Sequence, residues 1–182
     1  MSDLKPIKTY LAACIVIVLA ARGAATGGGE DRRERVVVYI HDTTLLKNAS
    51  MNTAAQAVGR SASMSTDKNL FGSVYVFEDP LTTGAARGSR TVGSAQGMYV
   101  YTGRSALGSL WAFTVFLEQR GSISVMGAEL IMQPSRLLPV VGGTRHFALA
   151  RGLVNLTTIA FKVPTYFVLR LDFDLLLPSF AS

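Results

Sequence analysis

Glu129 and Arg136 are a pair of side chains whose types and spacing suit acid chemistry. A carboxylic acid and a guanidinium lie seven residues apart. The acid can protonate a reacting group, and the cation can bind the negative charge that develops on that group. The alternative interpretation is an exposed ion pair on a loop, which would contribute little energy. The sequence alone leaves both interpretations open.

Asp42, Tyr99 and Tyr101 are further candidates for a binding site. Asp42 directly follows the apolar run VVVYI, and it is either a pocket residue or a turn or cap residue at the end of that strand. Tyr99 and Tyr101 are two positions apart, so they share one face of a strand. The alternative for the tyrosines is ordinary aromatic packing in a core or an interface.

Other polar motifs in the sequence are weaker candidates for a catalytic or metal site. Glu78 and Asp79 precede Pro80 and are interpreted as turn residues. The two histidines, His41 and His146, lie far apart in the sequence and match no metal-ligand spacing. We therefore expect neither a metal site nor another cofactor. The sequence also lacks the G-x-S-x-G motif of many serine hydrolases.

A glycine pair interrupts the stretch PVVGGTRHFALARG, residues 139–152. This stretch begins like a dinucleotide-binding loop, in which a strand leads into glycines and then into a helix that faces the pyrophosphate. Arg145 and His146 then occupy places where further glycines would lie, and no acidic residue follows at the distance that binds a ribose. We instead predict that Gly142 and Gly143 mark a tight turn or a close approach of the backbone.

The rest of the chain reads as strands separated by turns. Apolar and polar residues alternate with a period of two over most segments, which is typical of half-buried strands. The expected strands are 35–42, 71–81, 96–103, 109–119, 121–127 and 165–177, with two more inside 146–161 that a break near Gly152 separates. Residues 50–60 have modest helix propensity but can also be strand or loop. Many strands without βαβ spacing favour an antiparallel sheet, closed as a barrel or folded as a sandwich.

The N-terminus has the three parts of a secretory signal peptide. Two lysines precede an uncharged apolar run, Tyr10–Ala21, and small residues follow. The run is shorter than the roughly 20 residues that span a bilayer. We expect a signal peptide over residues 1–25, a flexible segment over 26–35 and one domain over 36–182. The single cysteine, Cys14, lies inside the signal, so the mature chain has no disulfide.

Charge and sequons bear on partners and location. Without the signal peptide the chain has 15 basic and 11 acidic residues, and its arginines are dispersed. This pattern argues against nucleic-acid binding. Sequons at Asn48 and Asn155 are candidate N-glycosylation sites for a secreted protein. Asn155 lies among apolar residues, so an unglycosylated strand residue fits it as well. We expect an extracellular protein that does not associate with membranes after signal cleavage.

Five sequence blocks, in order and with similar spacing, resemble the dirigent proteins of plants. They are His41-Asp42, FGSVYVFEDPLT (71–82), VGSAQGMYVY (92–101), VMGAE (125–129) and PVVGGTRHFALARG (139–152). The resemblance extends from about Val36 to the last strand. It implies an eight-stranded antiparallel β-barrel, usually a homotrimer, that is secreted to the cell wall and binds phenolic intermediates.

The resemblance also implies roles for the candidate residues. Asp42 matches the pocket aspartate of the family, and Tyr99 and Tyr101 match its paired pocket tyrosines. Arg136 matches the family's arginine, whereas Glu129 stands where lignan-forming members carry an aspartate. The extra methylene moves the carboxyl by about a bond length. In a site that discriminates the faces of a planar ligand, such a shift is expected to alter stereochemistry or substrate.

Three functions are consistent with this resemblance. In the first, the protein directs stereoselective coupling of phenoxy (monolignol) radicals in lignan biosynthesis, and an external laccase or peroxidase generates the radicals. The protein is then a stereochemical guide rather than an enzyme by itself. In the second, it is a dehydratase or cyclase that acts through a quinone methide, with Asp42, Arg136 and Glu129 as acid and electrostatic stabiliser. In the third, it is a wall-associated defence protein that binds phenolics or glycans without catalysis.

Overall fold

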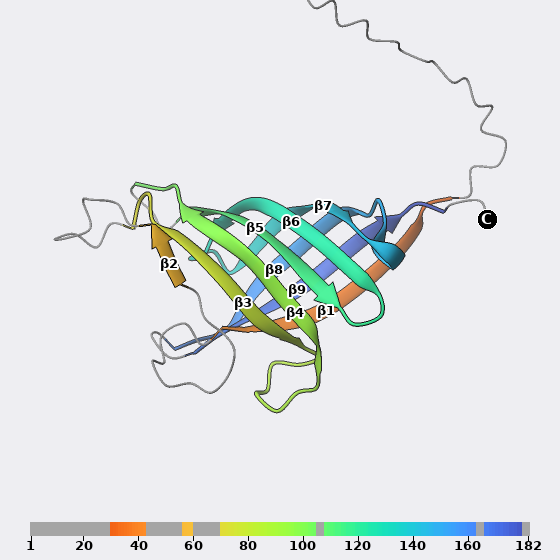
Figure 1. Cartoon of the computed structure of the whole chain (residues 1–182), viewed down its shortest axis with the longest axis horizontal. Coiled ribbons are helices and arrows are strands. Elements are labelled where there is room, and N and C mark those ends of the chain that lie inside the picture. Colours follow the sequence, from red (N-terminus) through yellow and green to blue (C-terminus); the bar gives the residue numbers. More distant parts are fainter. Residues whose placement is uncertain (1–29, 43–55, 60–69, 105–107, 163–165, 180–182) are drawn as a thin grey trace, which may run out of the picture.

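The computed structural model describes residues 30–42, 56–59, 70–104, 108–162 and 166–179. This part of the chain is almost entirely β-strand (Figure 1). The elements are β1 (Arg32–Asp42), β2 (Gln56–Gly59), β3 (Val74–Thr82), β4 (Thr91–Tyr101), β5 (Gly108–Leu117), β6 (Gly121–Leu130), β7 (Ser135–Gly143), the 3-10 helix η2 (Arg145–Phe147), β8 (Arg151–Lys162) and β9 (Tyr166–Leu177). The expected antiparallel strands are therefore present, and residues 56–59 are strand rather than helix.

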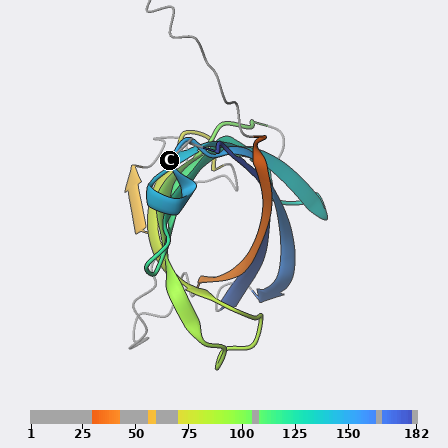
Figure 2. The same cartoon turned by 90° about the vertical axis from the view of Figure 1, so that its right-hand side faces the viewer.

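The sheet closes on itself to form a barrel. Its strand order is β1-β9-β8-β7-β6-β5-β4-β3-β2, and every pairing is antiparallel. An additional pairing between β1 and β3 joins the two sides, so eight strands form the ring and β2 lies outside it on β3. Figure 2 shows this ring from one end, with β2 beside it. The predicted eight-stranded antiparallel barrel is confirmed, and the alternative of a sandwich is wrong.

Alternating side chains fill the interior of the barrel. On β5, Trp111, Phe113, Val115 and Leu117 are all buried, as their spacing predicts. On β9 the same holds for Leu169, Leu171, Phe173 and Leu175. Burial of each such side chain contributes about 1.5–3 kcal/mol relative to exposure, so the period of two decides which face of every strand turns inward.

The η2 helix covers one end of this core. Its Phe147 is fully buried, and the guanidinium of Arg120 lies 4.8 Å from the centre of the Phe147 ring. His146, which was expected to begin a strand, lies instead in η2 and stacks edge-on against Phe147. Figure 1 shows η2 and the start of β1 at the same end of the barrel. We call this end the closed end and the opposite end the mouth.

Two sequence-based boundaries are wrong. Residues 146–161 hold one strand rather than two, since the segment before Gly152 forms η2 and β8 begins at Arg151. Gly152 lies inside β8 with a φ of 145°, and a Cβ atom there would lie 2.1 Å from the carbonyl oxygen of Asp174. Strand β1 begins at Arg32, inside the segment expected to be flexible. Cross-strand ion pairs order this start, with Arg33 bound to Asp174 at 2.9 Å.

The glycine pair at the end of β7 has one sterically required member. A Cβ atom on Gly143 would lie 2.4 Å from the carbonyl oxygen of Phe147 and 2.6 Å from that of Ser122. Gly142 has no atom within 4 Å of the same position. Close backbone approach therefore accounts for Gly143, which lets η2 fold back over the barrel end.

The seam between β1 and β3 is short. Only Tyr39 with Thr82 and Ile40 with Leu81 are paired across it. A side-chain network supports these pairs, since the Nε2 atom of His41 lies 2.9 Å from Thr82 Oγ1 and its Nδ1 atom lies 2.8 Å from the hydroxyl of Tyr166 on β9. Among the described residues, no helix is long and apolar enough to cross a membrane.

Candidate active site

Polar side chains gather at the mouth end of the otherwise apolar barrel interior. Seven of the eight ring strands contribute one or two of them, and β9 contributes Phe167 instead. They are Asp42 on β1, Asp79 on β3, Tyr99 and Tyr101 on β4, Ser109 on β5, Glu129 on β6, Arg136 on β7 and Thr158 on β8. An aromatic and acidic lining of this kind suits a flat organic ligand with a few polar groups.

Asp79 and Asp42 form a pair of carboxyls on the β1–β3 wall. Both line one cavity of about 10 Å³ together with Tyr99, Trp111 and Phe167, among others. Asp79 is 2% exposed, and its Oδ1 atom accepts no hydrogen bond from the described residues. Burial, and then the neighbouring charge of Asp42, raise the pKa of Asp79 to about 9. Asp79 therefore carries its proton at neutral pH and can act as an acid.

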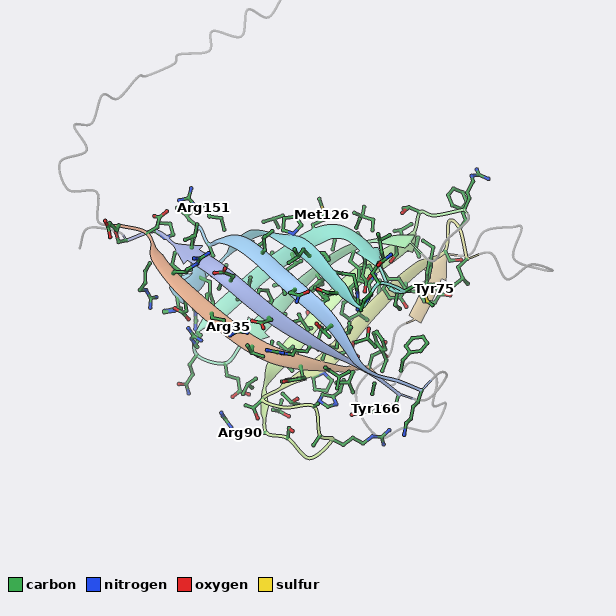
Figure 3. The ribbon with its side chains drawn as sticks, turned by 180° about the vertical axis from the view of Figure 1, so that it is seen from behind. Arg35, Tyr75, Arg90, Met126, Arg151 and Tyr166 are labelled. Atoms are coloured by element: carbon green, nitrogen blue, oxygen red, sulfur yellow. The ribbon has the colours of Figure 1, made fainter. Side chains whose placement is uncertain are left out.

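Aromatic rings form the adjoining wall on β3, β4 and β5. The Tyr99 ring stacks on Trp111 with centroids 5.3 Å apart and on Tyr75 with centroids 5.0 Å apart. Tyr101 meets Tyr99 edge-on at 5.7 Å. Burial raises the pKa of both Tyr99 and Tyr101, so their hydroxyls stay protonated and can donate hydrogen bonds. Figure 3 shows Tyr75 at this end of the barrel.

Glu129 and Arg136 form a buried ion pair on the β6–β7 wall. Glu129 is fully buried and Arg136 is 4% exposed. The Oε1 atom of Glu129 accepts hydrogen bonds from Nη2 of Arg136 at 2.8 Å and from Nε at 3.0 Å. Arg136 also donates to Thr158 Oγ1 at 2.9 Å and to the carbonyl oxygen of Gln133 at 3.1 Å. These contacts fix the guanidinium, and the exposed loop pair considered above is excluded.

The second oxygen of Glu129 differs from the first in its contacts. Its Oε2 atom is buried and accepts no hydrogen bond from the described residues. Burial raises the pKa of Glu129, while the hydrogen bonds and charge of Arg136 act in the opposite direction. A ligand hydroxyl can satisfy this oxygen, whereas an apolar group placed there would leave it without a partner.

The two acidic centres face each other across the barrel. In the ring order, β9 and β8 separate the β1–β3 wall from the β6–β7 wall on one side, and β4 and β5 separate them on the other. The aromatic wall of Tyr99 and Trp111 therefore connects the two centres. A planar ligand stacked on that wall would present opposite edges to Asp79 and to Glu129.

The structure brings together all five candidate residues named from the sequence and adds one that was missed. Asp79 was interpreted as a turn residue because it precedes Pro80, but β3 continues through Pro80 to Thr82 and turns Asp79 inward. The signal was the alternation of Phe77 and Asp79 with the exposed Val76 and Glu78. The roles of these residues stay predictions.

The remaining predicted sites lie outside the mouth. Asn155 is on β8, where its Oδ1 atom accepts a hydrogen bond from Ser135 at 2.6 Å, and Asn48 lies outside the described residues. The glycosylation of both remains a prediction. Within the described ranges, no group of three or more His, Cys, Asp or Glu side chains is arranged to hold a metal ion.

A closed antiparallel barrel with acids, an arginine and stacked aromatic rings at one end defines a class of small-molecule-binding barrels. Comparison with known proteins gives the family. The family model described as Dirigent-like protein matches residues 34–176. A dirigent protein of Sinopodophyllum hexandrum is 34% identical over 149 residues, which cover 78% of this chain and 77% of that protein. The chain belongs to the dirigent family.

Other relatives agree with this assignment. Dirigent protein 5 of Arabidopsis thaliana is 33% identical over 142 residues, which cover 76% of this chain and 77% of that protein. Pterocarpan synthase 1 of Glycine max is 35% identical over 119 residues, with 63% of this chain and 62% of that protein covered. The solved structure of a pterocarpan synthase dirigent protein superposes with a TM-score of 0.73 at 25% identity, covering 84% of this chain and 94% of the other.

Proposed function

We propose that the barrel mouth binds phenoxy radicals of monolignol type and directs their stereoselective coupling, with an external laccase or peroxidase supplying the one-electron oxidation. The observation that carries this proposal is the buried Asp79, whose pKa is raised by its burial, beside a wall of stacked aromatic rings. The rings hold planar phenols by stacking, and the acids select which oxygen lies where. Family membership supports a phenolic ligand.

The same acids can complete the reaction after coupling. Two coupled phenoxy radicals form a quinone methide, whose carbonyl oxygen becomes basic when a hydroxyl attacks the benzylic carbon. Asp79 donates its proton to that oxygen, and the attacking hydroxyl returns a proton, so the acid is restored. The negative charge of Asp42 favours this return because two neighbouring carboxylates repel each other.

Glu129 and Arg136 are proposed to hold the opposite end of the ligand. The free Oε2 atom of Glu129 accepts a phenol or side-chain hydroxyl, and Arg136 keeps the carboxyl in one orientation through two hydrogen bonds to Oε1. Because the ligand is held at both ends by contacts on opposite walls, it can turn only one of its two planar faces toward Trp111. This restriction supplies the stereochemical bias.

A second candidate function is favoured by the same Asp79 carboxyl. An acid with a pKa near 9 can also activate a quinone methide formed by loss of water from a hydroxylated phenol, without any oxidant. The protein would then be a dehydratase or cyclase. The resemblance to pterocarpan synthases is consistent with this alternative.

Ligand binding must move the aromatic side chains of the mouth. The cavity of about 10 Å³ holds no more than a single water molecule. Ligand pockets are usually about 300–1,000 Å³, so a phenylpropanoid must displace ring contacts of Tyr99, Trp111 or Phe167. Trp111 is the only tryptophan of the chain, and its fluorescence therefore reports this displacement directly.

The deciding experiment supplies coniferyl alcohol with and without a one-electron oxidant and resolves the products on a chiral column. Coupling guidance predicts an enantiomeric excess that needs both oxidant and protein. The dehydratase alternative predicts that a hydroxylated phenolic precursor is consumed without oxidant. Racemic products, no consumption and no change in Trp111 fluorescence would exclude both functions for these substrates and leave the non-catalytic defence role.

Matched variants separate the acid from its surroundings. Asp79→Asn keeps the size of the side chain but removes the acidic proton. The enantiomeric excess of the products, or the rate at which the precursor is consumed, should fall at least tenfold, as expected for loss of a general acid. Glu78→Gln is the control, because Glu78 is exposed on the outer face of the same strand, where its carboxylate accepts a hydrogen bond from Gln96 at 2.9 Å. Equal activity of both variants would remove Asp79 from the proposal.

The proposed context is an extracellular homotrimer. The outer face of β4, β5, β6 and β7 supports assembly, since it exposes large apolar side chains that monomers rarely gather. They are Met98, Leu110, Met126, Leu137 and Val141, each 43–64% exposed. Figure 3 shows Met126 at the upper edge of the barrel, away from Arg35 of β1. Secretion through the signal peptide would bring the barrel together with wall oxidases.

A further inference from the structure

A second concave site lies in the barrel wall, away from the mouth. It has a volume of about 460 Å³ and is lined by β1, by the β3–β4 connection and by the β5–β6 turn. Its floor includes Val36, Val38, Val92 and Leu117, and its rim includes Arg90. This volume falls within the range of ligand sites. The proposed function of the mouth does not use this cleft.

The cleft exists because β1 lacks a partner along part of one edge. On one side, β9 pairs with the whole of β1 from Arg32 to Asp42. On the other side, pairing with β3 stops at Tyr39, since β3 ends at Thr82. Within the described ranges, no strand pairs with residues 35–38 on that side, and no backbone hydrogen bond reaches them from the β3–β4 connection or the β5–β6 turn. An unpaired edge of this kind is a template for another strand.

The charges around this edge favour an acidic partner. Three guanidiniums, those of Arg35, Arg90 and Arg120, line the cleft, against a single carboxylate, Glu118. Arg35 binds Asp172 and Arg120 binds Glu34, so part of their charge is already balanced. Arg90 is exposed, and its side chain makes no hydrogen bond, ion pair or ring contact with the described residues. Figure 3 shows Arg35 and Arg90 on the same flank of the molecule.

The side-chain alternation of β1 specifies the pattern that a partner needs. Val36 and Val38 face the interior, whereas Arg35 faces outward. An added strand would continue this alternation, so its inward residues would meet Val92 and Leu117, and its outward residues would meet the arginines. A segment that alternates acidic and apolar residues satisfies both requirements.

We propose that this cleft binds an extended peptide segment with alternating acidic and apolar residues, which pairs as a strand with residues 35–38 of β1. The guanidiniums supply attraction and orientation, and the backbone of β1 supplies hydrogen bonds. The partner is thus a protein segment, and the phenolic site at the mouth stays independent of it.

The test uses the mature protein and a fluorescein-labelled hexapeptide, Glu-Val-Glu-Val-Glu-Val, followed by fluorescence anisotropy. Binding is expected to weaken with salt, and hydrogen exchange of the amides of residues 35–38 is expected to slow when the peptide is present. A Lys-Val peptide and a peptide methylated on alternate backbone nitrogens should not bind. If the methylated peptide binds as tightly as the parent peptide, ionic attraction alone accounts for the binding, and the proposal that the peptide pairs as a strand with β1 is wrong.

A charge reversal locates the site. Arg90→Glu should weaken the peptide about tenfold, as expected when an attractive rim contact becomes repulsive. Arg104→Glu is the control, because Arg104 is an exposed arginine that stacks on Phe71, outside the cleft. Equal loss in both variants, or no binding by the native protein, would overturn the proposal. Thermal unfolding of Arg90→Glu should match that of the native protein, since the salt bridges among the described residues do not include Arg90. Arg104→Glu loses the contact with Phe71 and should be slightly less stable.

Discussion

Replacing Asp79 with asparagine tests whether a buried carboxyl holds a proton at neutral pH. Burial and the charge of Asp42 raise the pKa of Asp79 to about 9, whereas an aspartate in an unfolded chain has a pKa of about 3.9. Between these values the folded state binds more protons than the unfolded state. The stability that this group contributes is therefore complete below about pH 4 and is lost as the pH rises toward about 9.

The size of the effect follows from linkage. The free energy of unfolding is expected to fall by up to about 1.4 kcal/mol per pH unit inside this window, or up to about 3 kcal/mol between about pH 5 and pH 7. In a domain of this size, about 1 kcal/mol shifts the midpoint of thermal unfolding by about 2–4 °C, so Tm should fall by up to about 6–12 °C. Asp79→Asn has no proton to lose and should show a flatter profile.

Circular dichroism melts at several pH values and constant ionic strength measure both profiles. Carboxylates away from the mouth act equally in the two proteins, so the difference between the profiles isolates Asp79 together with Asp42 and Glu78, whose charges interact with it. Glu78→Gln, on the exposed face of β3, should keep most of the native slope, since burial and the charge of Asp42 raise the pKa of Asp79 more than the charge of Glu78 does. Parallel profiles for the native protein and Asp79→Asn would show that Asp79 is ionised when folded, and the reasoning about a neutral acid at the mouth would fail.

Three further predictions concern packing and assembly. Arg136→Ala should cost about 3–5 kcal/mol in urea unfolding, because it leaves the Glu129 charge buried, and combining Arg136→Met with Glu129→Gln should recover most of that loss. Gly143→Ala should cost about 1–3 kcal/mol by forcing the backbone of η2 outward, whereas Gly142→Ala should cost less, since nothing lies within 4 Å of its Cβ position and only its φ of 159° disfavours a side chain. Leu137→Glu on the apolar outer face should shift the mature protein toward monomer in light scattering coupled to gel filtration, and an unchanged mass would exclude this face from the proposed trimer.

The regular alternation of apolar and polar residues made most of the fold predictable from the sequence. Strands β5 and β9 carry long rows of apolar residues at every second position, and only one pairing register buries such a row. Boundaries were harder to predict. Gly152 suggested a break because glycine is frequent in turns, yet its required contact is with Asp174, a residue that only the folded sheet brings near.

The site was less predictable than the fold. Glu129 and Arg136 were paired from their residue types, but their burial depends on the inward turn of both β6 and β7. Asp79 was missed because an Asp-Pro pair usually marks a turn, and the tolerance of Pro80 within a strand depends on the short pairing of β3 with β1. The facing arrangement of two acidic walls follows from the strand order, which no local pattern contains.

The pairing of the first barrel strand with the last also governs when the fold can form during synthesis. Arg33 and Asp174 join positions 141 residues apart, and β1 pairs with β3 in the sheet at only two positions. The apolar run VVVYI of β1 therefore cannot pair with β9 until β9 has left the ribosome. Contacts between residues so far apart in the sequence also form slowly. Charged residues at Arg33 and Arg35 protect the waiting strand from pairing with other chains, as gatekeepers beside an aggregation-prone segment do.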